Sequence, residues 1–349
     1  MRFRRTPTWY RSRWVRAYLQ MLALSTGPIV VGPFRSELGF EVLYWQPFIA
    51  WVMKTYKINP ERLLVVSRGG MGQFYGQGVQ SKDLYSLRTV DQVRMENVLD
   101  QQTVGIQKQL VITDWDREVA RDAMEGKRAH LLHPSLMYWL FETWWEDETT
   151  ADHVARHTHY QPLPMVQVPE NFGLPKEYIA VRFYERFTFP LNPETEQAVQ
   201  DMVGGLAAKI PVVLLNQKIY ADDHVDFPLK GENVFTLPEA TDDTNFIAQA
   251  AVLQRAQAFV GTYGGVSQFA LRYGKPSLSF YTQFGGTAHA HLTLSQRLAR
   301  GIGVPFETVD LRAAALYKAT VGGLTMIEPR RVSSVVGSPP KPNTVAVTA

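Results

Sequence analysis

The sequence predicts an α/β protein built from two doubly wound parallel sheets that face each other across a cleft. Short apolar runs bounded by Gly and Pro alternate with segments of helical periodicity, which is the pattern of βαβ units. A stretch with four prolines and little periodicity, residues 161–177, interrupts this alternation before it restarts. The length of 349 residues favours two domains of ordinary size over one.

The first half is expected to contain buried parallel strands, because its apolar runs are short and continuous. Helical apolar spacing over 41–56 follows the first of them, and a polar helix over about 117–127 follows the third. The glycine-rich segment 69–78 is expected to form a flexible loop after the second. The expected strands are 28–33, 63–67, 109–113 and 129–132.

The second half repeats the alternation after the proline-rich stretch. Asn192 is expected to cap a helix that has Pro193 at its first position and runs to about residue 209. Further helices are expected over about 244–256 and after Gly265. The expected strands are 178–184, 211–215, 234–237, 258–261 and 277–281.

These segments predict an N-terminal arm at 1–25, two Rossmann-like domains at 26–165 and 166–330, and a tail at 331–349. The tail is expected to be disordered, because it is rich in Ser, Pro, Gly and Thr.

The composition excludes several chemistries. Hydrophobic residues make up 45% of the chain and charged residues 20%, which is typical of a globular protein. The absence of cysteine excludes a disulfide scaffold, a Cys-ligated zinc or iron–sulfur site and a thiol nucleophile.

The basic residues are concentrated at the two ends of the chain. Residues 1–16 contain six arginines and no acid, and residues 330–349 contain three basic residues and no acid. The body between them has a net charge of about −6, which argues against a nucleic-acid-binding protein.

The N-terminal arm has two interpretations. Trp9, Tyr10, Trp14 and Tyr18 lie among its arginines, and such a segment can rest on an anionic membrane surface. The alternative is a solvated basic arm. No apolar run reaches the roughly 18–20 residues of a membrane-spanning helix, and no convincing cleavage site for a signal peptide follows. The expected location is therefore cytoplasmic, with peripheral membrane contact as the open question.

Ligands of parallel sheets bind beyond the carboxyl ends of the strands, so the residues after each strand are the candidate site. Glu37 and Glu41 follow the first strand, four residues apart at the start of a helix. Either carboxylate can act as a general base on an acceptor hydroxyl. Alternatively, both are acids that stabilise the first turn of the helix.

Arg182 and Arg186 follow the first strand of the second half at the same kind of junction. Arginine presents a planar fork of donors to phosphate oxygens, so the pair suits a diphosphate. The alternative is an ion pair with Glu185 or another acid. Phosphate binding is favoured because Arg182 lies in an apolar strand, where an unpaired charge is costly.

Residues 244–281 have the order helix, strand, glycine-rich turn, helix, Gly-Lys-Pro and strand. The turn runs through Thr262 and Tyr263 to Gly264 and Gly265, and the helix that follows offers free backbone N–H groups to an anion. Ser267 and Gln268 in its first turn can add further donors.

Residues 244–281 resemble the nucleotide-sugar-binding region of GT-B-fold glycosyltransferases, and are particularly similar to the heptosyltransferase-like group. Gly39-Phe40-Glu41-Val42-Leu43 is similar to the Gly-Asp-Val-Leu segment that carries the catalytic acid of that group. Pro47 also matches, six residues after Glu41. This chain has Glu in place of Asp and inserts Phe40, and Glu37 is a competitor.

The resemblance implies an inverting glycosyltransferase with Glu41 as base and a nucleotide-diphosphate sugar as donor. It makes the first domain the acceptor domain, places Arg182 and Arg186 on the donor phosphates, and implies that no metal cofactor is needed. Arg-x-x-x-Arg is also loosely similar to fucosyltransferases that use GDP-fucose. Lys218, Tyr220 and Glu239 are candidates for base and ribose contacts.

Two other functions use the same kind of pocket, namely a GT-B-fold nucleotide-sugar epimerase and a non-catalytic protein that binds a nucleotide or sugar. The acceptor of a transferase would be a glycan or glycolipid.

Metal binding is disfavoured at three motifs. Asp114-Trp115-Asp116 follows an expected strand, but Arg117 can neutralise either acid. The His-x-His pairs at 157–159 and 289–291 have no nearby acid to complete a ligand set, although the second pair can contact a donor.

Overall fold

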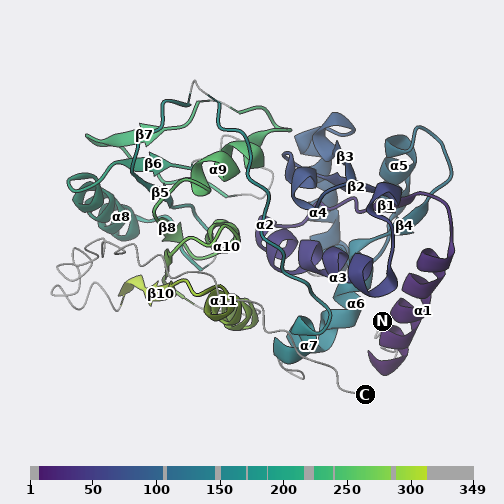
Figure 1. Ribbon diagram of the computed structural model, residues 1–349. Helices are drawn as coiled ribbons and strands as arrows, with labels where there is room; N and C mark the ends of the chain where they lie inside the picture. The colour runs from purple at the N-terminus through teal and green to yellow at the C-terminus, as the bar shows by residue number, and fades with distance from the viewer. Residues whose placement is uncertain are drawn as a thin grey trace, which may run out of the picture.

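The computed structural model describes residues 8–104, 108–145, 151–169, 172–186, 188–215, 224–238, 240–283 and 288–312. Within these ranges the strands form two sheets, and every pairing of neighbouring strands is parallel. The two sheets lie side by side, each with helices around it (Figure 1).

The first sheet has the strand order β3-β2-β1-β4 in the described part of the chain. Its register aligns Val30 of β1 with Leu64 of β2 and Leu131 of β4. The first strand is central, so the sheet winds outward in both directions and the topology reverses between β1 and β4. The strands are β1 (Ile29–Val31), β2 (Leu63–Ser67), β3 (Gln80–Asp83) and β4 (His130–Leu132).

The second sheet has the order β10-β9-β8-β5-β6-β7, again over the described residues. Read from β7, this is the third, second, first, fourth, fifth and sixth strand of this half, which is the order of a Rossmann fold. The topology reverses between β5 and β8. The predicted pair of Rossmann-like folds is therefore confirmed. The strands are β5 (Ile179–Arg182), β6 (Val212–Leu214), β7 (Val234–Thr236), β8 (Phe259–Thr262), β9 (Ser277–Tyr281) and β10 (Phe306–Asp310).

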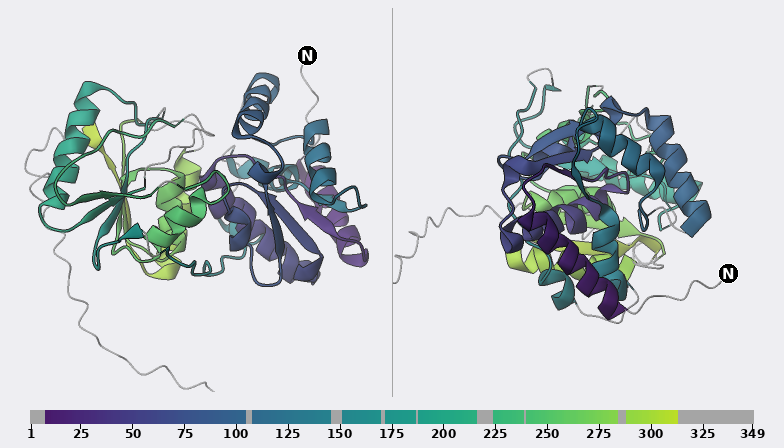
Figure 2. Two further views of the ribbon diagram at one scale, coloured as in Figure 1. Left: turned by 90° about the horizontal axis from the view of Figure 1, so that it is seen from above. Right: turned by 90° about the vertical axis from the view of Figure 1, so that its right-hand side faces the viewer.

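The helices cover the faces of both sheets, as Figures 1 and 2 show. Asn192 caps α8 as expected, since its side chain accepts a hydrogen bond from Thr195 N at 3.0 Å. The helices are α1 (Thr8–Leu24), α2 (Leu38–Phe40), α3 (Gln46–Tyr56), α4 (Val90–Val104), α5 (Asp114–Ala123), α6 (Pro134–Trp145), α7 (Ala151–Ala155), α8 (Pro193–Ala207), α9 (Asn245–Leu253), α10 (Gly265–Arg272) and α11 (Ala288–Ile302).

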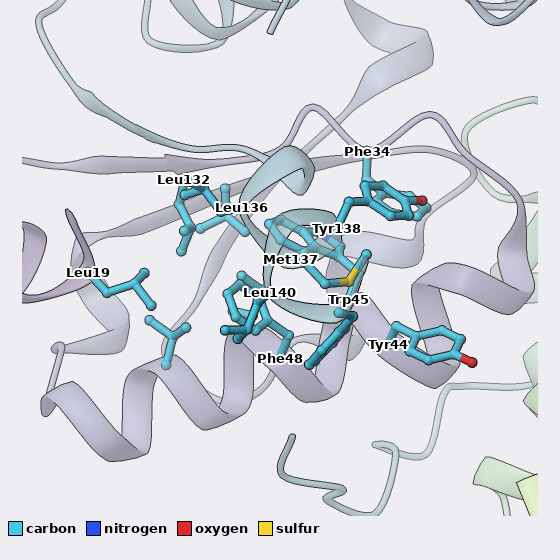
Figure 3. Packing of buried hydrophobic residues seen from close by; sticks show 14 of the residues in the cluster. Leu19, Phe34, Tyr44, Trp45, Phe48, Leu132, Leu136, Met137, Tyr138 and Leu140 are labelled. Carbon is cyan, nitrogen blue, oxygen red and sulfur yellow. The ribbon is translucent and has the colours of Figure 1, made fainter. Parts of the chain in front are cut away.

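The largest core of the first half lies between β1, α3 and α6. Trp45, Phe48, Met137 and Leu140 are buried there against one another (Figure 3). Ala290 and Leu294 of α11 belong to the same cluster, so the second half of the chain contributes to the core of the first.

One expected strand is wrong. Residues 109–113 form no strand, because the backbone groups of Leu110 bond elsewhere: its N–H donates to Lys108 O at 2.7 Å, and its carbonyl accepts from a side chain. Trp139 Nε1 donates to Leu110 O at 3.2 Å, and the side chain of Gln109 accepts from Arg35 N at 2.9 Å. Strand β3 has no apolar strand pattern in the sequence, because its four residues are polar and lie at the edge of the sheet.

The expected N-terminal arm is also wrong from Thr8 onward, because α1 is part of the folded core. Val15, Leu19 and Leu22, spaced along one face of the helix, are fully buried. Tyr18 Oη donates to Leu131 O at 2.9 Å, which joins α1 to β4. Residues 1–7 and the expected tail at 331–349 lie outside the described residues.

The glycine-rich segment after β2 is a packed connection between the halves, contrary to the expected flexible loop. Phe246 N donates to Gly69 O at 2.9 Å, and a Cβ at Gly69 would lie 2.6 Å from the Phe246 ring. Arg272 of α10 makes a second connection, because its guanidinium donates to Val42 O and, at 3.0 Å, to Gln161 O.

Candidate functional site

A pocket lies where the reversal points of the two sheets meet. It is a shallow depression in which about 340 Å³ is free of protein atoms, open solvent included. The loop after β1, the segment after β5 and the N-terminal turn of α10 all contribute to its wall, as expected for ligand sites of doubly wound sheets. The lining residues are Glu37, Leu38, Gly39, Arg182, Tyr184, Arg186, His224, Phe246, Gly265 and Val266.

Glu37 provides the carboxylate of this pocket. It immediately precedes α2, and about a third of its side chain is exposed. Lys108 Nζ lies 3.2 Å from Glu37 Oε1, and this ammonium holds the pKa of Glu37 well below its usual range. The positive charge of Arg186 acts in the same direction. Glu37 is therefore ionised at neutral pH.

Lys108 is a site residue that the sequence did not predict. Its ammonium lies 3.7 Å from the centre of the Phe40 ring, so Lys108 is held both by an ion pair and by a cation–π contact. Gln109 fixes the adjacent backbone by accepting from Arg35 N at 2.9 Å and donating to Pro33 O at 2.7 Å. These contacts are tertiary, and no local pattern around residue 108 signals them.

Glu41 lies away from the pocket and is fully buried. Its Oε1 accepts hydrogen bonds from Ser67 Oγ at 2.5 Å and Tyr75 Oη at 2.7 Å, while Oε2 has no partner among the described residues. Burial raises the pKa of Glu41 to about 7. The resemblance implied Glu41 as the base, but the structure brings Glu37 to the pocket instead.

Glu41 is the first residue of a π-helical turn, Glu41–Trp45. Gln46 N bonds to Glu41 O five residues earlier, where an α-helix would use a residue four earlier. Such a turn accommodates one additional residue, and this chain has Phe40 inserted between Gly39 and Glu41.

The two arginines differ in how they are held. Arg182 is buried and pairs with Asp226, with Nε 3.0 Å from Oδ1, so the ion-pair alternative applies to it, with Asp226 as the acid. Arg186 is hydrogen-bonded to the Tyr184 hydroxyl and donates to Tyr263 O at 3.5 Å, while its buried Nε has no hydrogen-bond partner among the described residues. Arg186 therefore retains donor capacity for a ligand.

The glycine turn before α10 is packed against both halves. A Cβ at Gly264 would lie 2.2 Å from Tyr184 Oη and 2.8 Å from Arg186 Nη1. A Cβ at Gly265 would lie 2.7 Å from Gly39 N. Only residues without a side chain allow α10 to start at the pocket, where its first N–H groups favour an anion.

Of the other residues expected to contact the donor substrate, some bond to the protein itself. Thr262 Oγ1 accepts from Tyr184 N at 3.0 Å, and Ser267 Oγ accepts from Gly264 N at 3.2 Å, so both hydroxyls stabilise the turn. Tyr263 and Gln268 are buried and do not line the pocket. Lys218, Tyr220 and Glu239 lie outside the described residues.

His224, Tyr184 and Phe246 line the pocket without having been anticipated. The His224 and Tyr184 rings lie 4.6 Å apart, which gives the pocket an aromatic wall next to Arg186. His224 follows a polar stretch with no strand pattern, so its position could not be read from the sequence.

Several residues of the motifs at which metal binding was disfavoured bond to other side chains of the protein. Asp116 belongs to the N-terminal capping box of α5 and lies 3.3 Å from His133 Nε2, while Asp114 pairs with Arg117 at 2.8 Å. His291 is partly buried, with its Nδ1 2.7 Å from Tyr44 Oη. Among the described residues, no group of three or more potential ligands could hold a metal ion.

No family model matches this sequence, and no curated protein matches it. Among solved structures, the chain is similar to the E. coli heptosyltransferase WaaC with ADP (13% identity, TM-score 0.40, 75% of this chain and 89% of that one). It is also similar to a family 9 glycosyl transferase from Veillonella parvula (13%, TM-score 0.43, 86% and 98%). A third is the E. coli ADP-heptose lps heptosyltransferase II (12%, TM-score 0.42, 83% and 99%). The fold itself is established by the strand order of the two sheets.

Proposed function

We propose that the chain is a glycosyltransferase that moves a sugar from a nucleotide-diphosphate sugar to a hydroxyl group of a glycan or glycolipid. One observation carries the proposal. An ionised carboxylate from the first sheet, Glu37, and a guanidinium with unused donor capacity, Arg186, line one pocket at the reversal points of two Rossmann-like sheets. The similarity of residues 244–281 to nucleotide-sugar-binding regions supports the same reaction class.

The leaving diphosphate would bind on the second half. The N–H groups at the start of α10 and the guanidinium of Arg186 offer positive charge where negative charge develops as the sugar–phosphate bond breaks. These groups supply the stabilisation without a metal ion. Gly264 packs closely against Tyr184 and Arg186, and this packing holds the hydrogen-bond donors in place before the substrate binds. The side chains then need little rearrangement when the sugar–phosphate bond breaks.

Glu37 would accept the proton of the acceptor hydroxyl as that oxygen attacks the anomeric carbon. The new carbon–oxygen bond forms as the bond to the diphosphate breaks, so one displacement inverts the anomeric configuration. Geometry favours Glu37 over Glu41 as the base, because a base must reach the proton before its pKa matters. The pKa of Glu41 is closer to neutrality, but its carboxyl group is fully buried and does not line the pocket.

None of the described helices is long and apolar enough to cross a membrane. A cytoplasmic protein in peripheral contact with a membrane, where glycolipid acceptors are found, completes the proposal.

Binding and turnover test the proposal separately. A nucleoside diphosphate that binds the folded state raises the melting temperature, so ADP, GDP and UDP at millimolar concentration form the first panel. Donor sugars of the nucleotide that binds are then incubated without acceptor, and slow transfer to water is followed as released nucleoside diphosphate. Glu37→Gln should lower this rate about 10²–10⁴-fold.

Glu41→Gln serves as the matched control and should retain most of the activity. The proposal is wrong if no nucleotide raises the melting temperature, or if Glu37→Gln turns over as fast as the wild type.

A further inference from the structure

Helix α1 has two apolar faces, of which the protein core covers only one. Val15, Leu19 and Leu22 form the buried face. The second face is the α1 stripe, whose members follow one another at alternating spacings of four and three residues and so lie along one side of the helix. The α1 stripe consists of Tyr10, Trp14, Ala17, Met21 and Leu24, all of them exposed.

The α1 stripe is large, and it is presented by an ordered helix. Trp14 is 43% exposed, Met21 41% and Leu24 77%. The Trp14 ring nevertheless stacks on Tyr18 with centroids 5.4 Å apart and packs against Trp139 of α6 at 5.5 Å. A fixed aromatic side chain that remains this exposed is typical of a binding surface.

The α1 helix itself is positively charged. Arg13 is exposed beside the α1 stripe, and no acidic residue precedes Glu37 in the chain. A partner with negative charge is therefore favoured. A second copy of the chain is disfavoured, because pairing two α1 helices would bring their arginines together.

We propose that the α1 stripe binds the surface of an anionic lipid bilayer. Tryptophan and tyrosine favour the interface between headgroups and acyl chains, and neighbouring arginines are attracted to anionic lipids. At about 1.5 Å per residue, 17 residues give a helix of about 25 Å that would lie along the surface. In the right-hand view of Figure 2, α1 lies at the front of the molecule, away from the second sheet.

Contact at α1 would hold the first half against the bilayer. This part of the inference rests on the proposed function, because the first half would bind the acceptor and a glycolipid acceptor resides in the bilayer. The lipid-binding property of α1 is independent of it.

Vesicle sedimentation of the full-length protein tests the surface. The probes are vesicles of pure phosphatidylcholine and vesicles with an equal amount of phosphatidylglycerol. We expect binding only to the second kind, weakened by high salt. Trp14→Ser with Met21→Ser should reduce partitioning at least about tenfold, because both side chains lose their apolar contact. Arg13→Gln should reduce it about fivefold.

Helix α4 provides a matched control. Met95 and Leu99 are 64% and 46% exposed on it, so Met95→Ser with Leu99→Ser removes similar apolar area elsewhere and should leave partitioning unchanged. The inference is overturned if the wild type does not bind the anionic vesicles, or if both double variants lose binding equally. It is also overturned if light scattering finds a dimer that the Trp14/Met21 variant alone abolishes.

Thermal shift with nucleoside diphosphates on the same samples reports the folding of each variant and separates the two proposals. Retained nucleotide binding without vesicle binding contradicts only the membrane surface. Vesicle binding without nucleotide binding contradicts only the proposed function.

Discussion

Lys108 Nζ lies 3.2 Å from Glu37 Oε1 and 3.7 Å from the centre of the Phe40 ring. The ammonium therefore connects the carboxylate before α2 with the aromatic side chain at its end. Because the ion pair is only partly exposed, it stabilises the charged form of Glu37 more than a surface pair would. Lys108 sets the pH range in which Glu37 can accept a proton.

Lys108→Met should move the acid limb of the kcat/KM profile to higher pH. The folded-state pKa of Glu37 is lowered chiefly by Lys108, so removing the ammonium raises it, and a higher pH is needed to ionise the carboxylate. The pH profile of donor turnover measures this shift. Lys82→Met, which removes an ammonium 3.5 Å from Glu125, is the matched control and should leave the profile unchanged. An unshifted profile in Lys108→Met would show that Lys108 does not act through Glu37.

The buried carboxyl group of Glu41 should lower the stability of the protein as the pH rises. Burial raises its pKa from 4.5 to about 7, so between these values the folded state holds a proton that the unfolded state has lost. The loss amounts to about 3 kcal/mol across the window, from about 1.4 kcal/mol per pKa unit. Chemical denaturation at pH 5 and pH 8 should therefore show Glu41→Gln gaining stability relative to the wild type at the higher pH.

The neighbouring Asp83 contributes a slope of the same sign, because burial raises its pKa to about 6. Asp83 is present in both proteins, so its contribution cancels in their difference. A difference between the two proteins that is independent of pH would mean that Glu41 is already ionised in the fold.

The choice between Glu37 and Glu41 shows what the sequence could and could not predict. Both acids follow β1, and the position of the site beyond that strand follows from the alternation of strands and helices. Which carboxylate faces the pocket depends on the local backbone. Glu37 precedes α2, whereas Glu41 begins a π-helical turn, and such a turn leaves no distinct pattern in the sequence. Lys108 could not be predicted for a different reason, since its position depends on contacts with Glu37 and Phe40, which are distant in the sequence.

His157 should lower stability in acid. Arg16 Nη2 donates to His157 Nε2 at 2.8 Å, and His157 Nδ1 donates to His153 O at 2.8 Å, so the ring must be neutral. Burial lowers its pKa from 6.5 to about 4. Above pH 6.5 its contribution to stability is complete, and it is lost as the pH falls toward 4, by about 3 kcal/mol in all.

Denaturation midpoints of the wild type and His157→Gln at pH 7.5 and pH 5 measure this effect, with His289→Gln, at an exposed histidine, as the control. We expect the wild type to lose more stability than His157→Gln between the two pH values. Equal losses would mean that His157 is protonated in the fold and that its contact with Arg16 is not made in solution.

Gly264 should be essential for the donor side of the pocket. A methyl group there would lie 2.2 Å from Tyr184 Oη and 2.8 Å from Arg186 Nη1, so both side chains must move away from the start of α10. A displacement of about 1 Å in such a site can cost about 10²-fold in rate. Gly264→Ala should therefore weaken nucleoside diphosphate binding and turnover by at least about tenfold, measured by titration calorimetry and donor hydrolysis.

Gly204→Ala is the matched control, because it lies within α8 and its methyl group would meet nothing within 4 Å. This control should bind the nucleotide normally and gain about 0.5–1 kcal/mol of stability, since alanine loses less conformational entropy than glycine in a helix. Normal binding by Gly264→Ala would mean that the diphosphate does not sit at the start of α10.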